Sequence, residues 1–417
     1  MSSILITNTQ LNGTPTDVLI EGNRFTDIGP GLQATADTVI DGSHTAILPG
    51  LVNAHTHAAM TLLRGYADDM ELHTWLTEHI WPFEAGLTEE DVYAGALLAC
   101  LEMIKSGTTC FCDMYWHFHG TARAVEEMGL RGDLSAVFID FGDPDRARDF
   151  QEQSVRLLKE RERYSERVRF VLGPHAPYTV SRESLDWIKG FAADHGLRIQ
   201  IHLSETAKEV ADSLEQHGRR PVQLLDEMGF LGPEVIAVHA IWLDGEEMDL
   251  LAKRGVKVVH NPTSNMKLCS GSFAYPDLRS RGVVMGLGTD GCSSNNNLDM
   301  FEEMKFAALL AKHDSGDPTV LPADQALELA TAGGAEVLGL DAGAIAAGKL
   351  ADCILVDLTD PQMVPCHHLA SNLVYAAHGS CVRTTICNGS VLMRDRVVEG
   401  EEEIIARVRE TVRRLGR

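Results

Sequence analysis

The chain has 417 residues, of which 44% are hydrophobic, and a formal net charge of -24 at pH 7. This length suits one large barrel with additions, or two to three domains. The excess of acidic residues disfavours nucleic acid and anionic membranes as partners, because both carry negative charge that requires a basic protein surface. The simplest explanation of this negative charge is that it keeps the protein in solution. No apolar run approaches the roughly 20 residues that span a bilayer.

The first residues and the cysteines indicate the cellular compartment. Met-Ser-Ser-Ile-Leu-Ile-Thr-Asn has neither the basic segment nor the apolar core of an export signal. Nine cysteines are scattered along the chain without a Cys-x-x-Cys pair. An odd number of cysteines without an export signal is typical of a reducing compartment. We therefore expect a cytoplasmic protein.

Short apolar segments separated by turn residues occur at both ends of the chain. Asn12-Gly13 near the start and Asn388-Gly389 near the end lie between such segments. Asn-Gly between two apolar runs is a strong signal for a β-hairpin. We therefore expect residues 1–50 and 346–417 to form one small β-sandwich, with a helix at the C-terminus. The expected strands are Ile4–Thr7, Asp17–Glu21, Arg24–Ile28, Thr38–Asp41, Ala351–Asp357, Arg383–Cys387 and Val391–Arg394.

Between the two ends, apolar strands alternate with helix-like segments. Most of these strands are apolar on both faces, as buried parallel strands are. A capping box at Thr88–Asp91 and a serine at Ser181 mark helix starts. Repeated βα units predict an α/β fold over residues 51–345, a TIM-type (β/α)8 barrel. The expected strands are Leu51–His57, Thr108–Met114, Gly132–Ile139, Arg167–Pro174, Arg198–Leu203, Val235–Ile241, Val256–Asn261 and Val283–Thr289.

Titratable side chains gather at the ends of these strands. In a TIM-type barrel the carboxyl ends of the strands form the rim where catalytic groups lie. Random placement would scatter histidines over surface helices, where His195, His217 and His313 lie and have no assigned role. The residues at or just after strand ends are His55, His57, Asp113, His175, His202, Glu205, His239, His260 and Asp290.

Four of these residues form a candidate metal site. A site for one metal ion needs about four protein ligands, or three with an open position for water. The nitrogens of three histidines and one carboxylate suit zinc, with iron(II), manganese and nickel as alternatives. A two-metal site would need a bridging group such as a modified lysine, and residues 167–178 contain no lysine. We expect one divalent ion at His55, His57, His202 and Asp290.

The remaining rim residues predict hydrolysis. A bound metal lowers the pKa of its water toward about 7, which provides hydroxide at neutral pH. Glu205, our candidate general acid and base, can reach the site only if the chain turns just after Leu203, because residues three apart on a strand face opposite sides. His239 is a candidate to orient or stabilise the hydroxide; the alternative is a buried histidine that donates to the backbone. Asp290 is expected both to bind metal and to accept a proton.

Several ordered motifs resemble the amidohydrolase superfamily. More narrowly, the chain is similar to the 5-methylthioadenosine/S-adenosylhomocysteine deaminases and the related 5'-deoxyadenosine deaminases. The resemblance covers nearly the whole chain. Its motifs are Pro-Gly-Leu-Val-Asn-Ala-His-Thr-His (49–57), Trp-Leu-x4-Trp-Pro-x-Glu (75–84), Ser-Gly-Thr-Thr (106–109), Ile-His-Leu-Ser-Glu (201–205), His-Asn-Pro-x-Ser-Asn-x-Lys-Leu (260–268), Gly-Thr-Asp-Gly (288–291), Thr-Ala-Gly-Gly-Ala (331–335) and Gly-Lys-Leu-Ala-Asp (348–352).

The resemblance implies the same metal ligands, and substrate contacts at Glu84, His175, Glu205 and Asp290. Glu84, which we expect on an irregular segment, would accept hydrogen bonds from two ribose hydroxyls; the alternative is a solvated glutamate. His175 would donate to a purine ring nitrogen. Glu205 would protonate the ring while hydroxide adds at the amino-bearing carbon, and ammonia then leaves.

One position departs from the family pattern. Some members carry a substrate-binding arginine on the third strand, where this chain has Ala136, and Arg131 lies before that strand. The departure favours small 5'-substituents, as in 5'-deoxyadenosine or 5'-methylthioadenosine. Guanine or cytosine deaminases and triazine chlorohydrolases are the closest alternatives, and a non-catalytic binding protein is a remote one. Glu84 favours a substrate with ribose hydroxyls. The resemblance also implies a homo-oligomer, dimer or tetramer.

Overall fold

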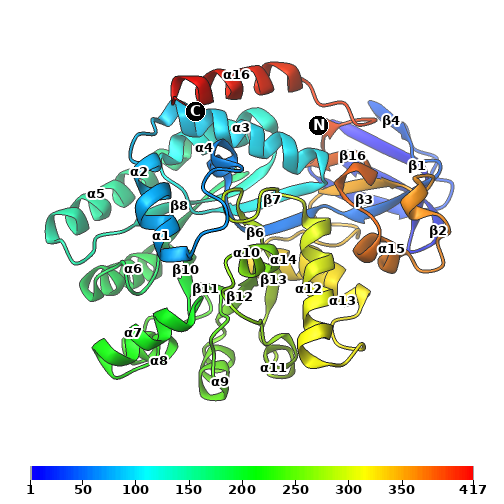
Figure 1. Cartoon of the computed structure of the whole chain (residues 1–417). Coiled ribbons are helices and arrows are strands. Elements are labelled where there is room, and N and C mark those ends of the chain that lie inside the picture. The colour runs from blue at the N-terminus through cyan, green and yellow to red at the C-terminus, as the bar shows by residue number, and fades with distance from the viewer. Residues whose placement is uncertain (1, 417) are drawn as a thin grey trace.

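The computed structural model describes residues 2–416 and contains a barrel of parallel strands surrounded by helices (Figure 1). Each barrel strand pairs in parallel with its neighbours in the order β13-β12-β11-β10-β9-β8-β7-β6-β14. This confirms the TIM-type barrel that the sequence predicts. The strands are β6 (Leu51–His57), β7 (Thr108–Asp113), β8 (Arg131–Phe138), β9 (Val168–Pro174), β10 (Ile199–Leu203), β11 (Val235–His239), β12 (Lys257–His260), β13 (Met285–Leu287) and β14 (Asp290–Gly291).

β13 and β14 are two parts of the eighth strand, and they close the barrel. The backbone N–H of Gly288 donates to the carbonyl oxygen of His260 on β12 (3.0 Å), and that of Thr289 donates to His55 on β6 (3.1 Å). Consecutive residues thus bond to the strands on either side. Gly288 passes so close to β6 that a Cβ atom would lie 2.7 Å from the carbonyl oxygen of His55. The close fit at this break explains why the eighth strand is not the unbroken segment that the sequence predicts.

Helices cover the outside of the barrel. Thr88 and Asp91 form the capping box of α3 (Glu89–Lys105), as the sequence predicts. The hydroxyl of Ser181 accepts the N–H of Ser184 at the start of α6 (Arg182–His195), also as predicted. The segment after β6 contains η1 (Ala58–Leu63), α1 (Leu72–Thr74), η2 (Trp75–Ile80) and α2 (Trp81–Glu84). The other helices of the barrel region are α3 (Glu89–Lys105), α4 (Phe118–Met128), α5 (Pro144–Glu160), η3 (Arg161–Arg163), α6 (Arg182–His195), α7 (Ala207–His217), α8 (Pro221–Glu227), α9 (Gly245–Arg254), α10 (Pro262–Lys267), α11 (Tyr275–Ser280), α12 (Met300–Ser315), α13 (Ala323–Glu328), η4 (Leu329–Gly333) and α14 (Gly334–Val337).

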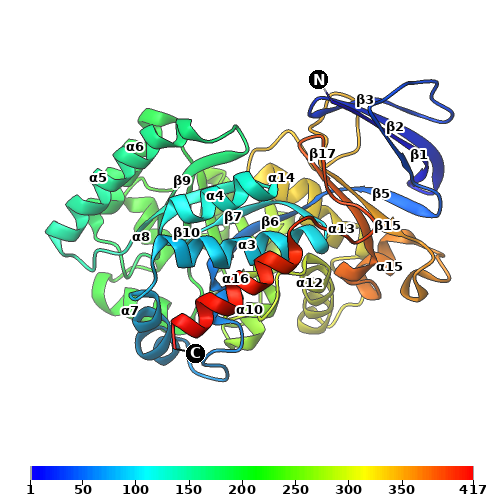
Figure 2. The same cartoon turned by 90° about the horizontal axis from the view of Figure 1, so that it is seen from above.

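The two ends of the chain meet in a second sheet, which lies beside the barrel (Figure 2). Its order is β17-β16-β15-β5-β1-β2-β3, with β4 also paired to β1. β5 and β15 pair antiparallel and join the N-terminal strands to the C-terminal ones. The strands share one apolar core, and we propose that the barrel comprises residues 51–345. The strands of this second sheet are β1 (Ser3–Leu11), β2 (Thr14–Glu21), β3 (Arg24–Gly29), β4 (Thr38–Asp41), β5 (Thr45–Pro49), β15 (Cys353–Asp357), β16 (Val382–Cys387) and β17 (Ser390–Met393).

The C-terminal region adds helices to this sheet. α15 (Leu369–Tyr375) lies between β15 and β16, flanked by η5 (Pro361–Met363) and η6 (Gly379–Cys381). The final helix, α16 (Glu401–Arg414), crosses back over the barrel along α3 (Figure 2). Across residues 2–416, no helix is both long and apolar enough to span a bilayer.

A buried ion pair joins the barrel to the second sheet. Arg131, the first residue of β8, donates from Nε to Oδ2 of Asp352 (2.7 Å), and both side chains are almost fully buried. A second guanidinium nitrogen donates to Oδ1 of Asn388 (2.8 Å), whose backbone N–H donates to Asp352 (2.7 Å). A charge removed from water in this way depends on its partner.

Asp352→Ala is therefore expected to lower the free energy of unfolding by about 3–5 kcal/mol, because it leaves the Arg131 guanidinium buried without its counter-charge. Chemical denaturation followed by circular dichroism measures the change. Asp145→Ala, which breaks an exposed ion pair with Arg148, is the control and should cost less than about 1 kcal/mol. Equal losses in the two variants would contradict a special role for the buried pair.

Candidate metal centre and active site

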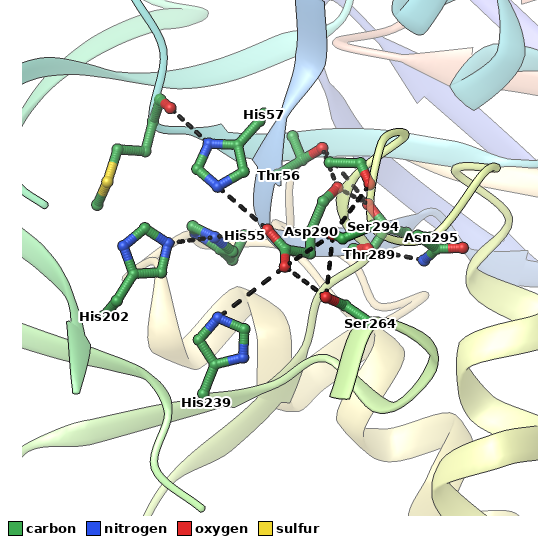
Figure 3. Close-up of polar contacts among 12 residues, drawn as sticks. His55, Thr56, His57, His202, His239, Ser264, Thr289, Asp290, Ser294 and Asn295 are labelled. Atoms are coloured by element: carbon green, nitrogen blue, oxygen red, sulfur yellow. Dashed lines mark hydrogen bonds and ion pairs between the residues drawn. The ribbon is translucent and has the colours of Figure 1, made fainter. Parts of the chain in front are cut away.

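Three histidines and one aspartate converge at the carboxyl end of the barrel strands (Figure 3). Nε2 of His202 lies 3.2 Å from Nε2 of His55. Oδ1 of Asp290 lies 3.1 Å from Nε2 of His57 and 3.5 Å from Nε2 of His55. One possible ligand atom from each residue lies within 4.8 Å of the others. The closing of the barrel places Asp290 of β14 beside the two histidines of β6.

The ring orientations of His57 and His202 are set by backbone carbonyl groups. Nδ1–H of His57 donates to the carbonyl oxygen of Met114 (2.6 Å), and Nδ1–H of His202 donates to that of His175 (2.7 Å). A carbonyl oxygen only accepts hydrogen bonds, so each Nδ1 atom carries a proton. The Nε2 atoms of both rings therefore turn toward the centre of the cluster.

His55 is oriented in the same way by a side chain. Its Nδ1–H donates to Oε1 of Gln200 (2.9 Å), because the amide nitrogen of Gln200 donates to Ser135 (2.8 Å) and to the carbonyl oxygen of Asp113 (3.1 Å). Three Nε2 atoms then face one carboxylate with no donor between them unless one ring takes a second proton. A cation relieves this repulsion, and the donor set fits a divalent metal ion such as zinc.

The pKa values of the cluster reflect the same demand for positive charge. Burial alone would lower the pKa of His57, but its contact with Asp290 outweighs this and raises the pKa to about 9. Burial would raise the pKa of Asp290, but its contacts with His55 and His57 hold it well below its usual range. Burial and the neighbouring His175 lower the pKa of His202. Asp290 is thus an ionised ligand, and a bound cation would take the place of the proton on His57.

Asp290 is held by groups on its other side. The hydroxyl of Ser264 donates to Oδ2 (2.6 Å), and that of Ser294 is 3.2 Å from the same oxygen (Figure 3). The backbone of Asp290 has φ +59°, in the left-handed region that non-glycine residues rarely adopt. These contacts fix Oδ2 and leave Oδ1 facing the histidines.

Glu205 reaches the site because the chain turns immediately after β10. Ser204 has φ +52°, and the carboxylate of Glu209 accepts the backbone N–H groups of both Ser204 and Glu205 (2.8 Å each). This turn is the one that the sequence requires after Leu203. Oε1 of Glu205 accepts the hydroxyl of Ser270 (3.1 Å). Burial raises the pKa of Glu205, which favours a carboxyl group that can hold and release a proton.

His239 lies between the other two candidate catalytic residues. Its Nε2 atom is 3.8 Å from Oε2 of Glu205 and 4.0 Å from Oδ2 of Asp290. Its Nδ1 atom is 2.7 Å from Oδ1 of Asn265, so it bonds to a side chain and not to the backbone, and the alternative interpretation of this histidine is wrong. The amide nitrogen of Asn265 in turn lies 3.2 Å from Nδ1 of His260.

The metal cluster opens into a cavity that we call the inner cavity. Its apolar walls include Trp75, Ile80 and Trp81 from the segment after β6, and Val137 and Ile139 at the end of β8. Its polar lining includes His57, Glu84, Tyr115, His175, Tyr178, His202, Glu205, His239 and Asp290. The structure therefore brings all the predicted metal, catalytic and substrate-contact residues except the fully buried His55 to the surface of one cavity.

Glu84 lies at the end of α2, so the expected irregular segment is wrong. α2 follows directly on η2, and Pro82 is its second residue. Oε2 of Glu84 accepts the indole N–H of Trp116 (3.2 Å). Among the described residues, neither the buried Oε1 of Glu84 nor the hydroxyl of Tyr115, which lies near this carboxyl group, has a hydrogen-bond partner. Burial raises the pKa of Glu84. A buried carboxylate oxygen without a donor marks a place for a ligand hydroxyl.

The remaining rim residues, His175, Asp113 and His260, lie in or near the site. His175 lies in the inner cavity with its Nδ1 atom 3.0 Å from the hydroxyl of Thr179. Asp113 accepts the backbone N–H of Ala58 (2.7 Å). His260 stacks on Phe273, with ring centroids 4.1 Å apart, outside the inner cavity.

Sequence reasoning missed several residues that hold the site, among them Gln200, Ser264, Asn265 and Glu209. Ser264 and Asn265 belong to the His-Asn-Pro-x-Ser-Asn motif, which marked this segment without showing what each side chain contacts. Glu209 stands four residues after Glu205, at the start of α7, and no sequence signal separates it from an ordinary helix-start acid.

Comparison with known proteins identifies the family. The sequence model of the Amidohydrolase family matches residues 46–392. The chain belongs to this family.

Two relatives with named activities match all or nearly all of this chain. The 5'-deoxyadenosine deaminase of Methanoregula boonei is 51% identical over 100% of this chain and 96% of its own length. The 5-methylthioadenosine/S-adenosylhomocysteine deaminase 1 of Archaeoglobus fulgidus is 48% identical over 95% of this chain and 94% of its own. The resemblance predicted from the motifs is confirmed.

Solved structures share the architecture. A zinc-bound adenosine deaminase from Xanthomonas campestris has a TM-score of 0.93 and 35% sequence identity, covering 99% of this chain and 98% of its own. A zinc-bound atrazine chlorohydrolase from Arthrobacter aurescens has a TM-score of 0.90 at 23% identity, over 98% of this chain and 100% of its own, and shows the same fold alone.

Single substitutions should distinguish a metal ligand from the candidate acid–base residue. His202→Ala is expected to lose metal and activity together, whereas Glu205→Gln should retain metal and lose about 100- to 10,000-fold in turnover, because only proton transfer is removed. Elemental analysis of the purified variants and an ammonia assay measure the two properties. His313→Ala, at a surface histidine with a side chain 86% exposed, is the control. Full metal occupancy in His202→Ala, or normal turnover in Glu205→Gln, would contradict the assignment.

We expect Asn265 to orient His239 and to have no effect on metal binding. Asn265→Ala removes the acceptor of Nδ1–H, and we expect kcat to fall about 10- to 100-fold with metal content unchanged, because the His239 ring loses its fixed orientation. Asn265→Asp keeps an acceptor oxygen in the same place and should retain more activity than the alanine variant. Steady-state kinetics with elemental analysis test this. Equal activity in both variants would remove Asn265 from this role.

Proposed function

We propose that this protein is a metal-dependent hydrolytic deaminase of 5'-modified adenosines. It would convert 5'-deoxyadenosine, 5'-methylthioadenosine or S-adenosylhomocysteine into the inosine analogue and ammonia. One observation carries the proposal. The inner cavity holds, together, the candidate metal ligands, the candidate acid Glu205 and the buried Glu84 with one oxygen that lacks a donor. The deaminases of Methanoregula boonei and Archaeoglobus fulgidus support the choice of substrate class.

The residues of the cavity have complementary roles in this reaction. When bound at His55, His57, His202 and Asp290, one divalent ion supplies a hydroxide nucleophile at neutral pH. Glu205 delivers a proton to the purine ring as the amino-bearing carbon is attacked, and His239 orients the nucleophile. Asp290 accepts the proton that the nucleophile loses and passes it to the amino group, which departs as ammonia when its bond to the ring carbon breaks. His175 binds a ring nitrogen.

Glu84 distinguishes a nucleoside from a bare ring. Its unpartnered Oε1 atom and its Oε2 atom, 3.2 Å from Trp116, can accept hydrogen bonds from two adjacent hydroxyls. Guanine, cytosine and chlorotriazines have no ribose and would leave this buried carboxylate unsatisfied, at a cost of about 1–3 kcal/mol. A non-catalytic binding protein would have no need for the acid–base pair Glu205 and His239 beside a metal site.

The far wall of the inner cavity favours a small 5'-substituent. Ala136 is buried, and the neighbouring positions Val137 and Ile139 present apolar surface. Arg131 lies at the opposite end of β8, where Asp352 holds it. The described residues of this wall therefore offer no charged contact to a 5'-substituent, which suits a short, neutral group within the inner cavity.

The remaining properties follow from the same proposal. We propose zinc as the metal, because three imidazoles and one carboxylate suit it and because the Xanthomonas campestris relative was solved with zinc. A cytoplasmic location and a homo-oligomeric state, dimer or tetramer, stay predictions from the sequence.

A substrate panel tests the function. Purified, zinc-loaded protein is incubated with 5'-deoxyadenosine, 5'-methylthioadenosine, S-adenosylhomocysteine, adenosine, guanine and cytosine, and kcat/KM is measured by ammonia release. We expect the 5'-modified adenosines to be preferred and Glu84→Gln to lose at least 10-fold on nucleosides, because each hydrogen bond to a charged group contributes about 1.5–3 kcal/mol. Activity confined to guanine or cytosine would overturn the proposal.

A further inference from the structure

A second cavity, which we call the outer cavity, adjoins the inner one. The two share Leu72 and Leu76 of the segment after β6, Trp81 of α2, and Tyr178 of the loop after β9. Beyond this shared wall the outer cavity is bounded by Phe141 and by the side of α7. The side chains of Phe141 and Tyr178 are about half exposed, at 53% and 50%. A substrate whose base lies at the metal centre can therefore extend into a second space with aromatic walls.

The charged groups of the two cavities differ. Among the described residues that line either cavity, Lys208 is the only lysine or arginine, and it lies in the outer one. Its Nζ atom is 2.7 Å from Oδ2 of Asp212 on the same helix. Asp212 and then Glu71, which also lines the outer cavity, raise the pKa of Lys208. The outer cavity thus presents one ammonium group beside carboxylates, whereas no lysine or arginine is among the described residues that line the inner cavity.

The ion pair between Lys208 and Asp212 is poorly suited to a purely structural role. The two side chains are 63% and 41% exposed, and exposed pairs contribute little to stability. Lys208 is the second residue of α7, where the positive end of the helix dipole disfavours a cation. The lysine also precedes the acid at i,i+4, which is the weaker order for such a pair. A ligand that offers one charge of each sign can replace both contacts at small cost.

We propose that the outer cavity binds a 5'-substituent that ends in an amino acid, with the substrate carboxylate on Lys208 and its ammonium group on Asp212 and Glu71. This inference rests on the proposed function. It places the ribose at Glu84 and the substituent past Leu72, Leu76, Trp81 and Tyr178. Short neutral 5'-groups end within the inner cavity and do not reach Lys208. S-adenosylhomocysteine is the substrate of the proposed class that carries such a tail.

Single substitutions test this subsite. Lys208→Met and Asp212→Asn are compared with Lys253→Met, which removes a lysine from the last turn of α9, outside both cavities. For each variant kcat/KM is measured with 5'-deoxyadenosine, 5'-methylthioadenosine and S-adenosylhomocysteine. We expect Lys208→Met to lose about tenfold on S-adenosylhomocysteine, mainly through KM, because one charge-assisted contact is lost. Its values for the two short substrates and all values for Lys253→Met should stay within twofold.

The outcomes separate this inference from the proposed function. Turnover of 5'-deoxyadenosine by the unaltered protein reports on the proposed function alone. The affinity for S-adenosylhomocysteine, measured by calorimetry on zinc-loaded Glu205→Gln with and without Lys208→Met, reports on the subsite even where turnover is absent. Weaker binding that depends on Lys208 supports the subsite. Unchanged affinity, no binding at all, or an equal loss on 5'-deoxyadenosine would overturn it.

Discussion

The site depends on one electrostatic constraint: three imidazole nitrogens and one carboxylate meet in a space that has no donor unless one ring takes a second proton. His55, His57 and His202 are each held through Nδ1, so their Nε2 atoms turn toward Asp290. The barrel closes only when β14 lies beside β6, and that closure supplies the carboxylate. Folding therefore assembles a site that requires positive charge, which a divalent cation provides.

A second constraint comes from the backbone at the strand ends. The backbone φ angles of Ser204, His239 and Asp290 lie between +52° and +69°, a region that non-glycine residues rarely adopt. Side chains alternate along a regular strand, so turns of this kind are needed to bring residues just beyond a strand to the same cavity as the residues on it. Glu209, Asn265 and Ser264 hold the three turned residues through side-chain hydrogen bonds. The strain is thus located where the chemistry is proposed to occur.

The sequence predicts the barrel and the grouping of the site because both follow from local patterns. Eight apolar segments with polar residues at their ends specify which side chains meet at the rim. The break between β13 and β14 and the helical placement of Glu84 depend on close contacts between distant segments, which periodicity does not report. The partners Gln200, Asn265 and Glu209 lie on different elements from most of the groups they hold, so only the folded chain shows what they contact. The meeting of the two chain ends in one sheet was predicted, because Asn-Gly turns and apolar runs mark both ends. The strand β5, which pairs with β15, was not among the expected strands.

Anomalous X-ray diffraction at the zinc absorption edge, on crystals of protein grown with zinc, tests the central claim most directly. The account predicts a single strong peak per chain, about 2.0–2.2 Å from the Nε2 atoms of His55, His57 and His202 and from an oxygen of Asp290. Two peaks in the barrel mouth, a peak held by other residues, or four side chains turned apart around a featureless centre would contradict it.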